Sequence, residues 1–428
     1  MCAEYDPSRD HGHVTWRLQD EVPVVEIVNN WTCANFADTY RASSISVRVA
    51  QVLDAVQPHV LHVHSLLNLS FDLPSAARAR GIPIVATLHD YSLVCASGGQ
   101  RVHRADEHVC RSIDTERCAR CFRESPFFAQ AAFGRWSGAV RAPGRIRSAA
   151  VNLARRVPGA ADVFQAVTTA APGLAITAAD IQERLKAAAA VFDLIDLFVA
   201  PSKSIASEFQ RLGLPAHKIV VSDYGVPPLP PHSGTSNGGS HDRLRIGFVG
   251  TLVWHKGAHA LLDAVHLLPA DRFEVSVFGD RSVFPSYAAS LTTRAAGLPV
   301  TFRGAFGRQE VAAAYRQMDV LVVPSLWIEN SPLVIHEAFL AGVPVVGARI
   351  GGIEDLVTHD VTGLLYDPAS TRALADALNR LIDDPQLLMR LSQNVRQSAR
   401  VKSIADEALE WERVYDGLLT RADRRAPA

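Results

Sequence analysis

The sequence predicts an α/β protein built from two doubly wound parallel sheets, each with helices on both faces. Short, continuous apolar runs such as DVLVVPS at 319–325 have the pattern of strands that are buried on both sides of a parallel sheet. These runs alternate with helical segments, as strand–helix–strand crossovers require. A stretch rich in Pro, Gly and Ser at 227–240 separates the runs into two groups and is typical of an interdomain linker.

The composition is typical of a soluble globular protein. Of the 428 residues, 48% are hydrophobic and 20% are charged, and the formal net charge of −1 gives no global field that would attract nucleic acid. No apolar run reaches the roughly 18 to 20 residues of a membrane helix, and the opening MCAEYDPSRD lacks the apolar core of a signal peptide. We therefore expect a cytoplasmic protein, in which the six cysteines are thiols or metal ligands rather than disulfides.

The first half of the chain is expected to alternate between strands and helices after a start without pattern. Residues 1–20 are polar and unpatterned, and PVVEIV at 23–28 is the first expected strand. Proline and glycine mark the ends of several elements that follow. These elements are a helix at 43–57, a strand at 59–65, a helix at 73–81, a strand at 82–92, one or two helices in 174–198, a strand at 196–202, a helix from Ser202 to Gly213 and a strand at 218–225.

His89 lies near the end of the expected strand at 82–92, in the run Thr-Leu-His-Asp-Tyr. Open α/β sheets bind ligands beyond the carboxyl ends of their strands. His89 is therefore a candidate ligand contact, the alternative being a histidine of a surface loop. We expect His62 and His64, on the preceding strand, to be buried or to line the site rather than to act in catalysis.

Four cysteines, Cys95, Cys110, Cys118 and Cys121, lie in one segment that has few apolar residues. The last two form a Cys-x-x-Cys pair, a spacing that chelates metal ions. The segment predicts a structural tetrahedral site, with zinc as the first choice and an iron–sulfur cluster as the second. The alternative is a set of reduced structural thiols.

Residues 125–161 contain no Asp or Glu and form a basic segment with aromatic residues at its start. Such a segment could lie on an anionic membrane surface and position a lipid-linked acceptor. The alternative is a solvated helical face beside an acceptor cleft. The residues concerned are Arg135, Arg141, Arg145, Arg147, Arg155 and Arg156, with Phe127, Phe128, Phe133 and Trp136.

The second half begins with LRIGFVGTLVWHKG at 244–257, in which a strand ends at Gly250 and a turn carries Lys256 to the next helix. A lysine at such an edge neutralises phosphate. Strands are also expected at 273–280 and 300–306, but no Gly-x-Gly-x-x-Gly opens a helix after a strand, which argues against a dinucleotide site. Helices are expected at 370–383, 385–399 and 403–420.

The stretch 319–366 predicts an anion-binding helix start. Ser331 is expected to be the N-cap and Pro332 the first helical residue. The first-turn N–H groups of Leu333 and Val334 then face any anion bound there. Glu337 lies one helical turn beyond Leu333 among apolar residues, where a carboxylate needs hydrogen-bond donors such as a ribose diol.

The same stretch closely resembles the donor-binding signature of the family 4 retaining glycosyltransferases, which have the GT-B fold of two Rossmann-like domains facing across a cleft. The resemblance covers nearly the whole chain and is strongest over 244–366. The matching residues occur in one order: Pro324-Ser325, Glu329, Ser331-Pro332, Glu337-Ala338, Gly342-x-Pro344-Val345-Val346, Gly351-Gly352, Glu354 and Thr362-Gly363-Leu364.

The resemblance implies an enzyme that moves a sugar from a nucleoside diphosphate sugar to a glycan, lipid-linked or small-molecule acceptor without a catalytic metal. It implies front-face attack, with the leaving phosphate assisting deprotonation of the acceptor. In this scheme Lys256 acts in catalysis by holding the diphosphate, His89 and Glu329 contact the donor sugar, and Glu337 holds the ribose. The other donor-binding residues implied are Gly250, Thr251, Ser331, Leu333 and Val334, with Arg303 and Gly304 near the base.

Two departures from the family pattern bear on activity. The position of a diphosphate-binding arginine holds Thr251. The usual opening strand, Gly-rich loop and helix are not recognisable before residue 23, which predicts a start assigned too late or a degraded relative. The alternative function is therefore a nucleotide-sugar-binding or scaffold protein without turnover.

The expected domain organisation follows from these patterns. Residues 1–226 form an acceptor-side domain with a Cys-rich and Arg-rich helical insertion at 95–190. Residues 227–243 are the linker, and 244–402 form the nucleotide-sugar-binding domain. The last segment, 403–428, is expected to be a helix that packs back on the first domain.

Overall fold

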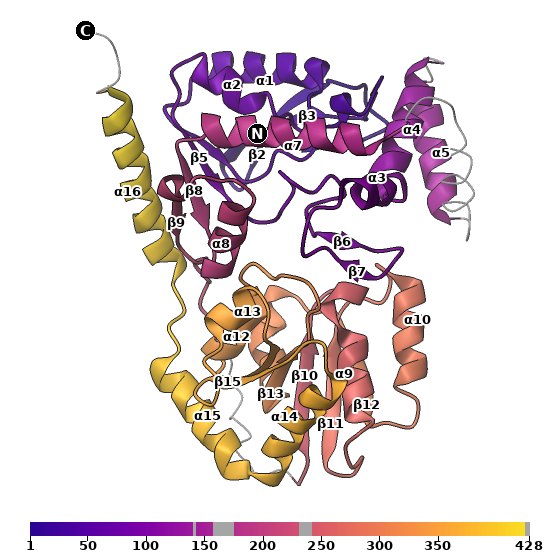
Figure 1. Ribbon diagram of the computed structural model, residues 1–428, viewed down its shortest axis with the longest axis vertical. Helices are drawn as coiled ribbons and strands as arrows, with labels where there is room; N and C mark the ends of the chain where they lie inside the picture. Colours follow the sequence, from indigo (N-terminus) through magenta and orange to yellow (C-terminus); the bar gives the residue numbers. More distant parts are fainter. Residues whose placement is uncertain (140–142, 157–174, 231–241, 424–428) are drawn as a thin grey trace. The chain divides into compact units, whose positions relative to one another are not determined.

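The computed structural model describes residues 1–139, 143–156, 175–230 and 242–423 (Figure 1). The chain forms two compact units. Unit 1 comprises Met1–Val199, Phe209–Val220 and Arg413–Ala428, and unit 2 comprises Ala200–Glu208 and Val221–Glu412. Most of the expected linker, residues 231–241, lies outside the described residues.

Unit 2 is built on a six-stranded sheet with the order β12-β11-β10-β13-β14-β15, in which every neighbouring pair is parallel. The apolar runs form these strands as predicted, and all residues of β13, β14 and β15 are buried. The strands are β10 (Leu244–Val249), β11 (Phe273–Phe278), β12 (Val300–Gly304), β13 (Val320–Val323), β14 (Val345–Ala348) and β15 (Gly363–Tyr366).

Helices cover both faces of this sheet (Figure 1). Contacts join α14 to α9, α15, β14 and β15, and join α12 to β13 and α15. The helices are α9 (Ala258–Val265), α10 (Pro285–Arg294), α11 (Val311–Tyr315), α12 (Leu333–Leu340), α13 (Gly352–Leu356), α14 (Thr371–Asp383) and α15 (Pro385–Ser398).

The strand order of unit 2 reverses between β10 and β13. The chain runs from β10 outward through β11 to β12 and then returns to place β13 on the other side of β10, where Ile246 pairs with Val320. The loops that leave β10 and β13 therefore diverge at the carboxyl edge of the sheet. Such a switch point is where open α/β sheets bind ligands.

Among its described residues, unit 1 contains three sheets, of which the smallest is the two-stranded pair of β6 (Val102–His103) and β7 (His108–Val109). Of the other two, the first has the order β1-β3-β2, and the second has the order β4-β5-β8-β9. Within the second sheet, β5 pairs in parallel with β4 and with β8, as predicted. The strands are β1 (Cys2–Glu4), β2 (Val14–Gln19), β3 (Val22–Val28), β4 (Leu61–Val63), β5 (Ile84–Thr87), β8 (Leu197–Ala200) and β9 (Ile219–Val221).

The expectation that residues 1–20 carry no pattern is wrong. β1 pairs in parallel with β3, and β2 pairs with β3 as an antiparallel hairpin. The hairpin turn places Asp20 and Glu21 at positive φ, which matches the twist of a tight two-residue turn. An apolar residue at every second position of β2, from Val14 to Leu18, was the signal for this strand.

The helices of unit 1 agree in type with the predicted elements. The expected helices of 174–198 form the single helix α7, which begins with a capping box of Thr177 and Asp180 and packs on α2 and α3. The helices are α1 (Ser43–Val56), α2 (Leu73–Arg78), α3 (Thr115–Arg123), α4 (Pro126–Ala139), α5 (Gly144–Arg156) and α7 (Ala178–Leu194); α8 (Lys203–Arg211) and α16 (Ile404–Asp423) contribute residues to both units. Among the described helices, none has the length and apolarity that a membrane span needs.

Candidate functional site

The carboxyl edge of the unit 2 sheet holds a lysine–glutamate ion pair at the strand switch point. Lys256 follows β10 and Glu329 follows β13, and the Lys256 Nζ lies 2.7 Å and 3.0 Å from the two Glu329 carboxylate oxygens. Gly257 (φ +74°) follows the lysine, and a Cβ there would lie 1.9 Å from the Pro324 carbonyl oxygen. A glycine is therefore needed for the β10 loop to reach the end of β13.

Two side chains hold the Glu329 carboxylate, and only 4% of this residue is exposed. Besides Lys256, the Ser325 hydroxyl donates a hydrogen bond to Glu329 Oε1 at 2.5 Å. The Trp327 ring lies beneath the ammonium, with 5.2 Å between Nζ and the ring centroid. These contacts give the buried carboxylate its hydrogen-bond partners and hold the lysine at the edge of the sheet where ligands bind.

The Gly351-Gly352 pair supports the Glu329 loop from the next strand connection. The Gly352 N–H donates to the Glu329 carbonyl at 2.8 Å. A Cβ on Gly352 would lie 1.7 Å from the Asn330 carbonyl oxygen, and one on Gly351 would lie 2.6 Å from the Glu329 carbonyl oxygen. The two glycines therefore let the loop after β14 pack directly on the backbone that carries Glu329.

The start of α12 differs by one residue from the prediction. The helix begins at Leu333, so Pro332 is the N-cap and Ser331 is not. The Ser331 hydroxyl instead donates to Asp223 Oδ1 at 2.6 Å and lies 2.9 Å from His336 Nε2. Burial opposes ionisation of Asp223, but hydrogen bonds from His336 and Ser331 outweigh it and lower the pKa of this carboxyl.

The first turn of α12 provides the expected N–H groups. The N–H groups of Leu333 and Val334 belong to the first turn, where a helix has no carbonyl groups of its own to accept their hydrogen bonds. One turn later, Glu337 is half-buried and accepts a hydrogen bond from the Tyr315 hydroxyl to Oε2 at 2.7 Å. Burial raises the pKa of Glu337, and the bond from Tyr315 offsets part of that rise.

The remaining predicted donor-binding residues share this edge of the sheet. Gly250 follows β10 directly, and Thr251 beside it is exposed. Arg303 and Gly304 end β12, two strands away from β10 in the sheet. Neighbouring strands are about 4.8 Å apart, so these ends lie on the order of 10 Å from β10. Their placement agrees with a ligand extended along the edge.

His89 occupies the carboxyl end of β5 in unit 1. Its Nε2 lies 2.8 Å from His64 Nδ1, and the two rings stack with 5.1 Å between their centroids. His62 stacks on His64 and contacts Thr87 Oγ1 and the Tyr415 hydroxyl, each at 2.8 Å. Partial burial and the neighbouring histidine lower the pKa of His89, and burial lowers the pKa of His62 to about 3.

A hollow in unit 1 opens at His89. Its lining includes His64, Ser65, Asp90 and Ser92 together with the end of β5. The expectation that His62 and His64 line the site rather than act in it remains a prediction. Sequence spacing did not reveal the direct contact between His64 and His89.

The four cysteines converge on a second hollow of unit 1. All four are free thiols and line it together with Ser97, Val102 and Arg117. Burial raises the pKa of the Cys118 thiol to about 12 and that of Cys121 to about 11. The thiols are gathered without being at ligand distance, because no three of their sulfurs lie within 4.8 Å of one another.

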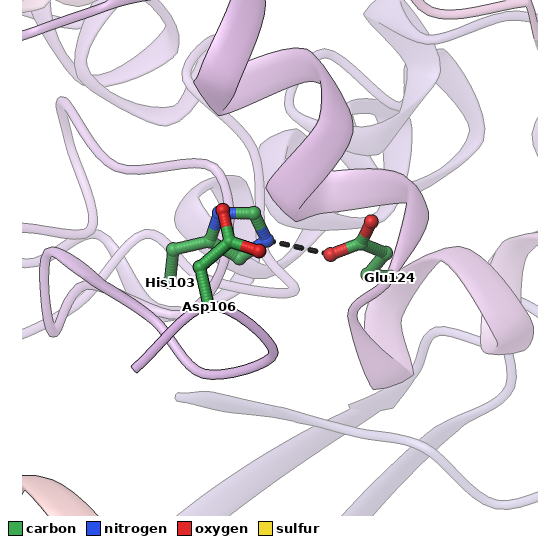
Figure 2. Close-up of side chains that lie close together, drawn as sticks. All are labelled: His103, Asp106 and Glu124. Atoms are coloured by element: carbon green, nitrogen blue, oxygen red, sulfur yellow. Dashed lines mark hydrogen bonds and ion pairs between the residues drawn. The ribbon is translucent and has the colours of Figure 1, made fainter. Parts of the chain in front are cut away.

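In the described part of the chain, only His103, Asp106 and Glu124 bring three metal-ligating atoms within 4.8 Å of one another. Figure 2 shows the His103 ring close to both carboxylates. Its Nε2 lies 2.6 Å from Glu124, its Nδ1 approaches Asp106 at 3.0 Å without hydrogen-bond geometry, and Arg120 also pairs with Asp106. The imidazole and Arg120 lie against the two carboxylates, and these contacts account for the cluster as a polar network without a metal ion.

The basic segment of 125–161 forms α4 and α5. Phe128 and Phe133 are buried, whereas Trp136 is exposed. Arg147 donates to the Pro7 carbonyl at 2.9 Å and pairs with Asp10, so it holds the amino-terminal segment. Arg135 and Arg145 are exposed; Arg141 and the side chains of Arg155 and Arg156 lie outside the described residues.

Three side chains of the unit 2 site were not predicted from the sequence. Trp327 and Tyr315 hold Lys256 and Glu337, and Asp223 holds the start of α12. Tyr315 ends a short helix, and Asp223 follows β9, so nothing in the local pattern links either of them to α12. Trp327 alone carried a signal, as a large aromatic residue between Ser325 and Glu329.

Comparison with known proteins identifies the family of the chain. The profile "Glycosyltransferase Family 4" matches residues 2–171, and the profile "Glycosyl transferases group 1" matches residues 236–398. The D-inositol 3-phosphate glycosyltransferase of Corynebacterium glutamicum is 34% identical over 179 residues, or 40% of this chain and 43% of the relative. That of Thermobispora bispora is 31% identical over 256 residues, or 55% of this chain and 59% of the relative. The chain thus spans about half the length of these relatives.

Solved structures share the fold. Sucrose-phosphate synthase from Thermosynechococcus elongatus superposes with a TM-score of 0.62 at 16% identity, covering 98% of this chain and 88% of that one. The Anabaena protein HepE, solved in complex with UDP and glucose, superposes with a TM-score of 0.56 at 17% identity, covering 86% of this chain and 81% of that one. At this level of identity the likeness establishes the two-domain α/β fold.

Proposed function

The chain belongs to the family 4 glycosyltransferases of GT-B fold, and from this premise we propose that it transfers a sugar from a nucleoside diphosphate sugar to a hydroxyl acceptor. The observation that carries the proposal is the Lys256–Glu329 pair at the β10/β13 switch point, next to the start of α12. This arrangement places a cation and a helix N-terminus at the edge where a diphosphate binds.

The diphosphate is held by Lys256 and by the first-turn N–H groups of Leu333 and Val334. Positive charge at this point stabilises the charge that develops on the leaving nucleotide, which is the largest contribution of a preorganised site. Gly250, Thr251 and Ser331 border the same position. Thr251 supplies a hydroxyl donor but no charge, so Lys256 carries more of the charge stabilisation than it would beside an arginine.

Glu337 holds the ribose, and Glu329 holds the donor sugar. Tyr315 occupies Oε2 of Glu337, and Oε1 has no partner in the part of the chain that the structure describes. That oxygen can accept hydrogen bonds from the ribose diol. The Glu329 carboxylate already accepts three bonds, and a carboxylate offers about four acceptor positions, so one remains for a sugar hydroxyl. Arg303 and Gly304 border the base.

The proposed reaction retains the configuration at the anomeric carbon and needs no metal ion. The acceptor oxygen forms a bond to the anomeric carbon on the face from which the nucleotide leaves, and the departing phosphate oxygen takes the acceptor proton. His89 contacts the donor sugar, and His64 sets the orientation of the His89 ring through the 2.8 Å contact. The anomeric configuration of the product, read by NMR, tests the stereochemical part of the proposal.

The acceptor is a glycan, a lipid-linked sugar or a small polyol phosphate. The names of the curated relatives make D-inositol 3-phosphate the first acceptor to test. A lipid-linked acceptor would place α4 and α5 against an anionic membrane, with Trp136, Arg135 and Arg145 as the exposed contacts. Binding to anionic vesicles that weakens with salt would support this arrangement, and no binding at low salt would exclude it.

Turnover decides between an enzyme and a binding protein. The purified chain is incubated with UDP- and GDP-sugars, with and without inositol phosphate or lipid-linked acceptors, and nucleotide release is measured by chromatography. Acceptor-dependent release that falls at least tenfold in His89→Ala supports the proposal. Tight donor binding without release under any condition supports a nucleotide-sugar-binding scaffold instead. Glu274→Gln, at the start of β11 on the opposite edge of the sheet, is the control.

A further inference from the structure

We propose that Cys95, Cys110, Cys118 and Cys121 bind one zinc ion through four thiolates, and that this ion holds the loop that follows His89. The site lies in unit 1 and is independent of the donor site of unit 2. Its function is structural, since four protein ligands leave no open position on a tetrahedral zinc ion.

Three separate backbone segments deliver the four thiols to one hollow. The Cys95 N–H donates to the Tyr91 carbonyl at 2.7 Å, which ends the turn after His89. Cys110 follows the small hairpin and donates from its N–H to the Arg101 carbonyl at 2.8 Å. Cys118 and Cys121 lie one turn apart on α3. All four thiols line the same hollow, whereas structural thiols without a shared role have no reason to gather at one place.

The hairpin that carries Cys110 is small. The hairpin consists of β6 (Val102–His103) and β7 (His108–Val109), and the two strands pair at two positions only. The buried apolar residues of β6, β7 and α3 are Val102, Ala119 and Phe122. A bound metal would add a cross-link between this hairpin and α3, which itself packs on α7 and α4, and all four cysteines here are free thiols.

Positive charges surround the hollow and match the net charge of the proposed site. One Zn²⁺ with four thiolates carries two negative charges, and binding releases one proton from each thiol. Arg101 and Arg117 line the hollow. Arg184 is buried and donates to the carbonyls of Leu93 at 3.0 Å and Ser92 at 2.5 Å, beside Cys95, and its other contacts are the rings of Tyr40 and Phe71. None of these partners is an anion, so a thiolate cluster supplies the negative charge.

Binding requires the sulfurs to move closer together. A zinc–sulfur distance of about 2.3 Å places tetrahedral sulfurs about 3.8 Å apart, whereas no three of these sulfurs lie within 4.8 Å of one another. Closing this gap requires the segment between Cys95 and Cys110, which contains Gly98 and Gly99 at left-handed φ values of +87° and +82°, to move toward α3. Closure would draw Cys95 toward α3 and fix the loop from His89 to Cys95.

Metal content of the full chain tests the proposal. The protein is purified without a metal-affinity step, and its zinc is measured by elemental analysis, with about one ion per chain expected. Replacing zinc by Co²⁺ should give the charge-transfer and d–d absorption bands of tetrahedral cobalt thiolate. Cys118→Ser with Cys121→Ser should lose the ion, whereas Cys2→Ser with Cys33→Ser and the single variant His103→Gln should retain it.

A second variant tests the proposal even if the double variant fails to fold. Cys95→Ser, which removes one ligand from a loop, should bind Co²⁺ at least tenfold more weakly and with altered bands while circular dichroism stays unchanged. Zinc-free protein that takes up neither Zn²⁺ nor Co²⁺ would overturn the proposal. So would a Cys118–Cys121 disulfide found by mass spectrometry, iron with labile sulfide in place of zinc, or zinc that survives the Cys118/Cys121 variant and is lost from His103→Gln.

Discussion

The Lys256 ammonium lies 2.7 Å and 3.0 Å from the two carboxylate oxygens of Glu329, although the two residues are 73 positions apart in the chain. The sheet topology brings them together, because β13 returns to lie beside β10. Before a donor binds, each charge neutralises the other. A bound diphosphate would share the lysine, and the glutamate would keep the lysine at the edge of the sheet.

This pairing predicts that stability and donor binding can be separated by a double-mutant cycle. Lys256→Ala leaves a buried carboxylate without its cation, so the free energy of unfolding should fall by about 2 to 3 kcal/mol. Adding Glu329→Gln to that variant removes the uncompensated charge and should restore most of the stability. Donor affinity should stay at least tenfold below that of the unmodified protein in both variants, because the diphosphate has lost its cation.

Denaturant unfolding and calorimetric titration with UDP-glucose provide the two measurements. Lys186→Ala removes an exposed lysine paired with Glu183 on α7 and should change neither quantity by more than about 0.5 kcal/mol. If the double variant bound the donor as tightly as the unmodified protein, Lys256 would not hold the diphosphate.

Glu337 should distinguish ribonucleotides from deoxyribonucleotides. Tyr315 holds one carboxylate oxygen, and the other has no hydrogen-bond partner among the described residues, so it can accept bonds from the ribose diol. Hydrogen bonds to a charged acceptor contribute about 1.5 to 3 kcal/mol, so Glu337→Gln should weaken UDP binding by about tenfold to a hundredfold. The variant should also lose most of the preference for UDP over 2′-deoxy-UDP.

The matched control for this experiment is Glu274→Gln, an exposed glutamate at the other edge of the same sheet. It should bind UDP and 2′-deoxy-UDP as the unmodified protein does. An unaltered preference in Glu337→Gln would remove the ribose from the proposed contacts of this residue.

Donor affinity should decrease on acidification through the titration of Glu337. Burial raises the pKa of this carboxyl above its ordinary value of 4.5, and the ribose hydroxyls bind the ionised form. The affinity for UDP-glucose should therefore be constant at high pH and begin to fall at a higher pH than an ordinary glutamate would cause. The difference between the unmodified protein and Glu337→Gln, measured by titration at several pH values, isolates this group. Parallel pH profiles for the two proteins would contradict the assignment.

Local patterns in the sequence were sufficient to predict the elements around the donor site. The apolar runs of β13 and β14 are long enough to be strands and too short to be helices, and Gly342 ends α12 with positive φ. Lys256 and Glu329 were each expected near a phosphate or sugar. Their direct contact was not expected, because a sequence pattern gives the type of each segment but not the order of strands in a sheet.

Each of the remaining differences between the predicted and the observed elements has an identifiable cause. The start of α12 moved by one residue because the Ser331 hydroxyl is bonded to Asp223, a partner from outside the helix, and so does not cap the helix. The first two strands were missed because β2 presents Trp16 and Leu18 to solvent. Exposed apolar residues within a polar segment gave a weak signal, although their alternation was present.

The close packing of Gly352 on the Glu329 loop predicts that even a methyl group disturbs the site. Gly352→Ala places a Cβ 1.7 Å from the Asn330 carbonyl oxygen, so the loop must shift. We expect a loss of about 1 to 3 kcal/mol in stability and weaker UDP binding. Gly417→Ala in α16 meets no atom within 4 Å and should be neutral or stabilising by up to about 1 kcal/mol. Equal effects of the two substitutions, in thermal unfolding and titration, would contradict the role of this contact.

His62 should make the protein sensitive to acid. Its folded-state pKa is lowered to about 3 from an ordinary value of 6.5, because burial and the neighbouring His64 and His89 disfavour the charged ring. Above pH 6.5 the ring is neutral in both states, so its contribution to stability is fully present there. Between pH 6.5 and 3 the unfolded chain binds a proton that the folded chain does not, and this contribution is progressively lost. The free energy of unfolding should change with pH by at most about 1.4 kcal/mol per pH unit, and solvent screening at this half-buried site reduces that change.

The measurement is the melting temperature at a series of pH values from 7 to 4. His62→Gln keeps hydrogen-bonding groups near Thr87 and Tyr415 but cannot take up a proton, so its melting temperature should fall less steeply with acidification than that of the unmodified protein. The exposed residue His59 provides the control, since His59→Gln should retain the full slope. If the melting temperature of His62→Gln fell with acidification as steeply as that of the unmodified protein, the acid sensitivity would arise from another group. The stacked histidines beside His89 would then not be the part of unit 1 that responds to pH.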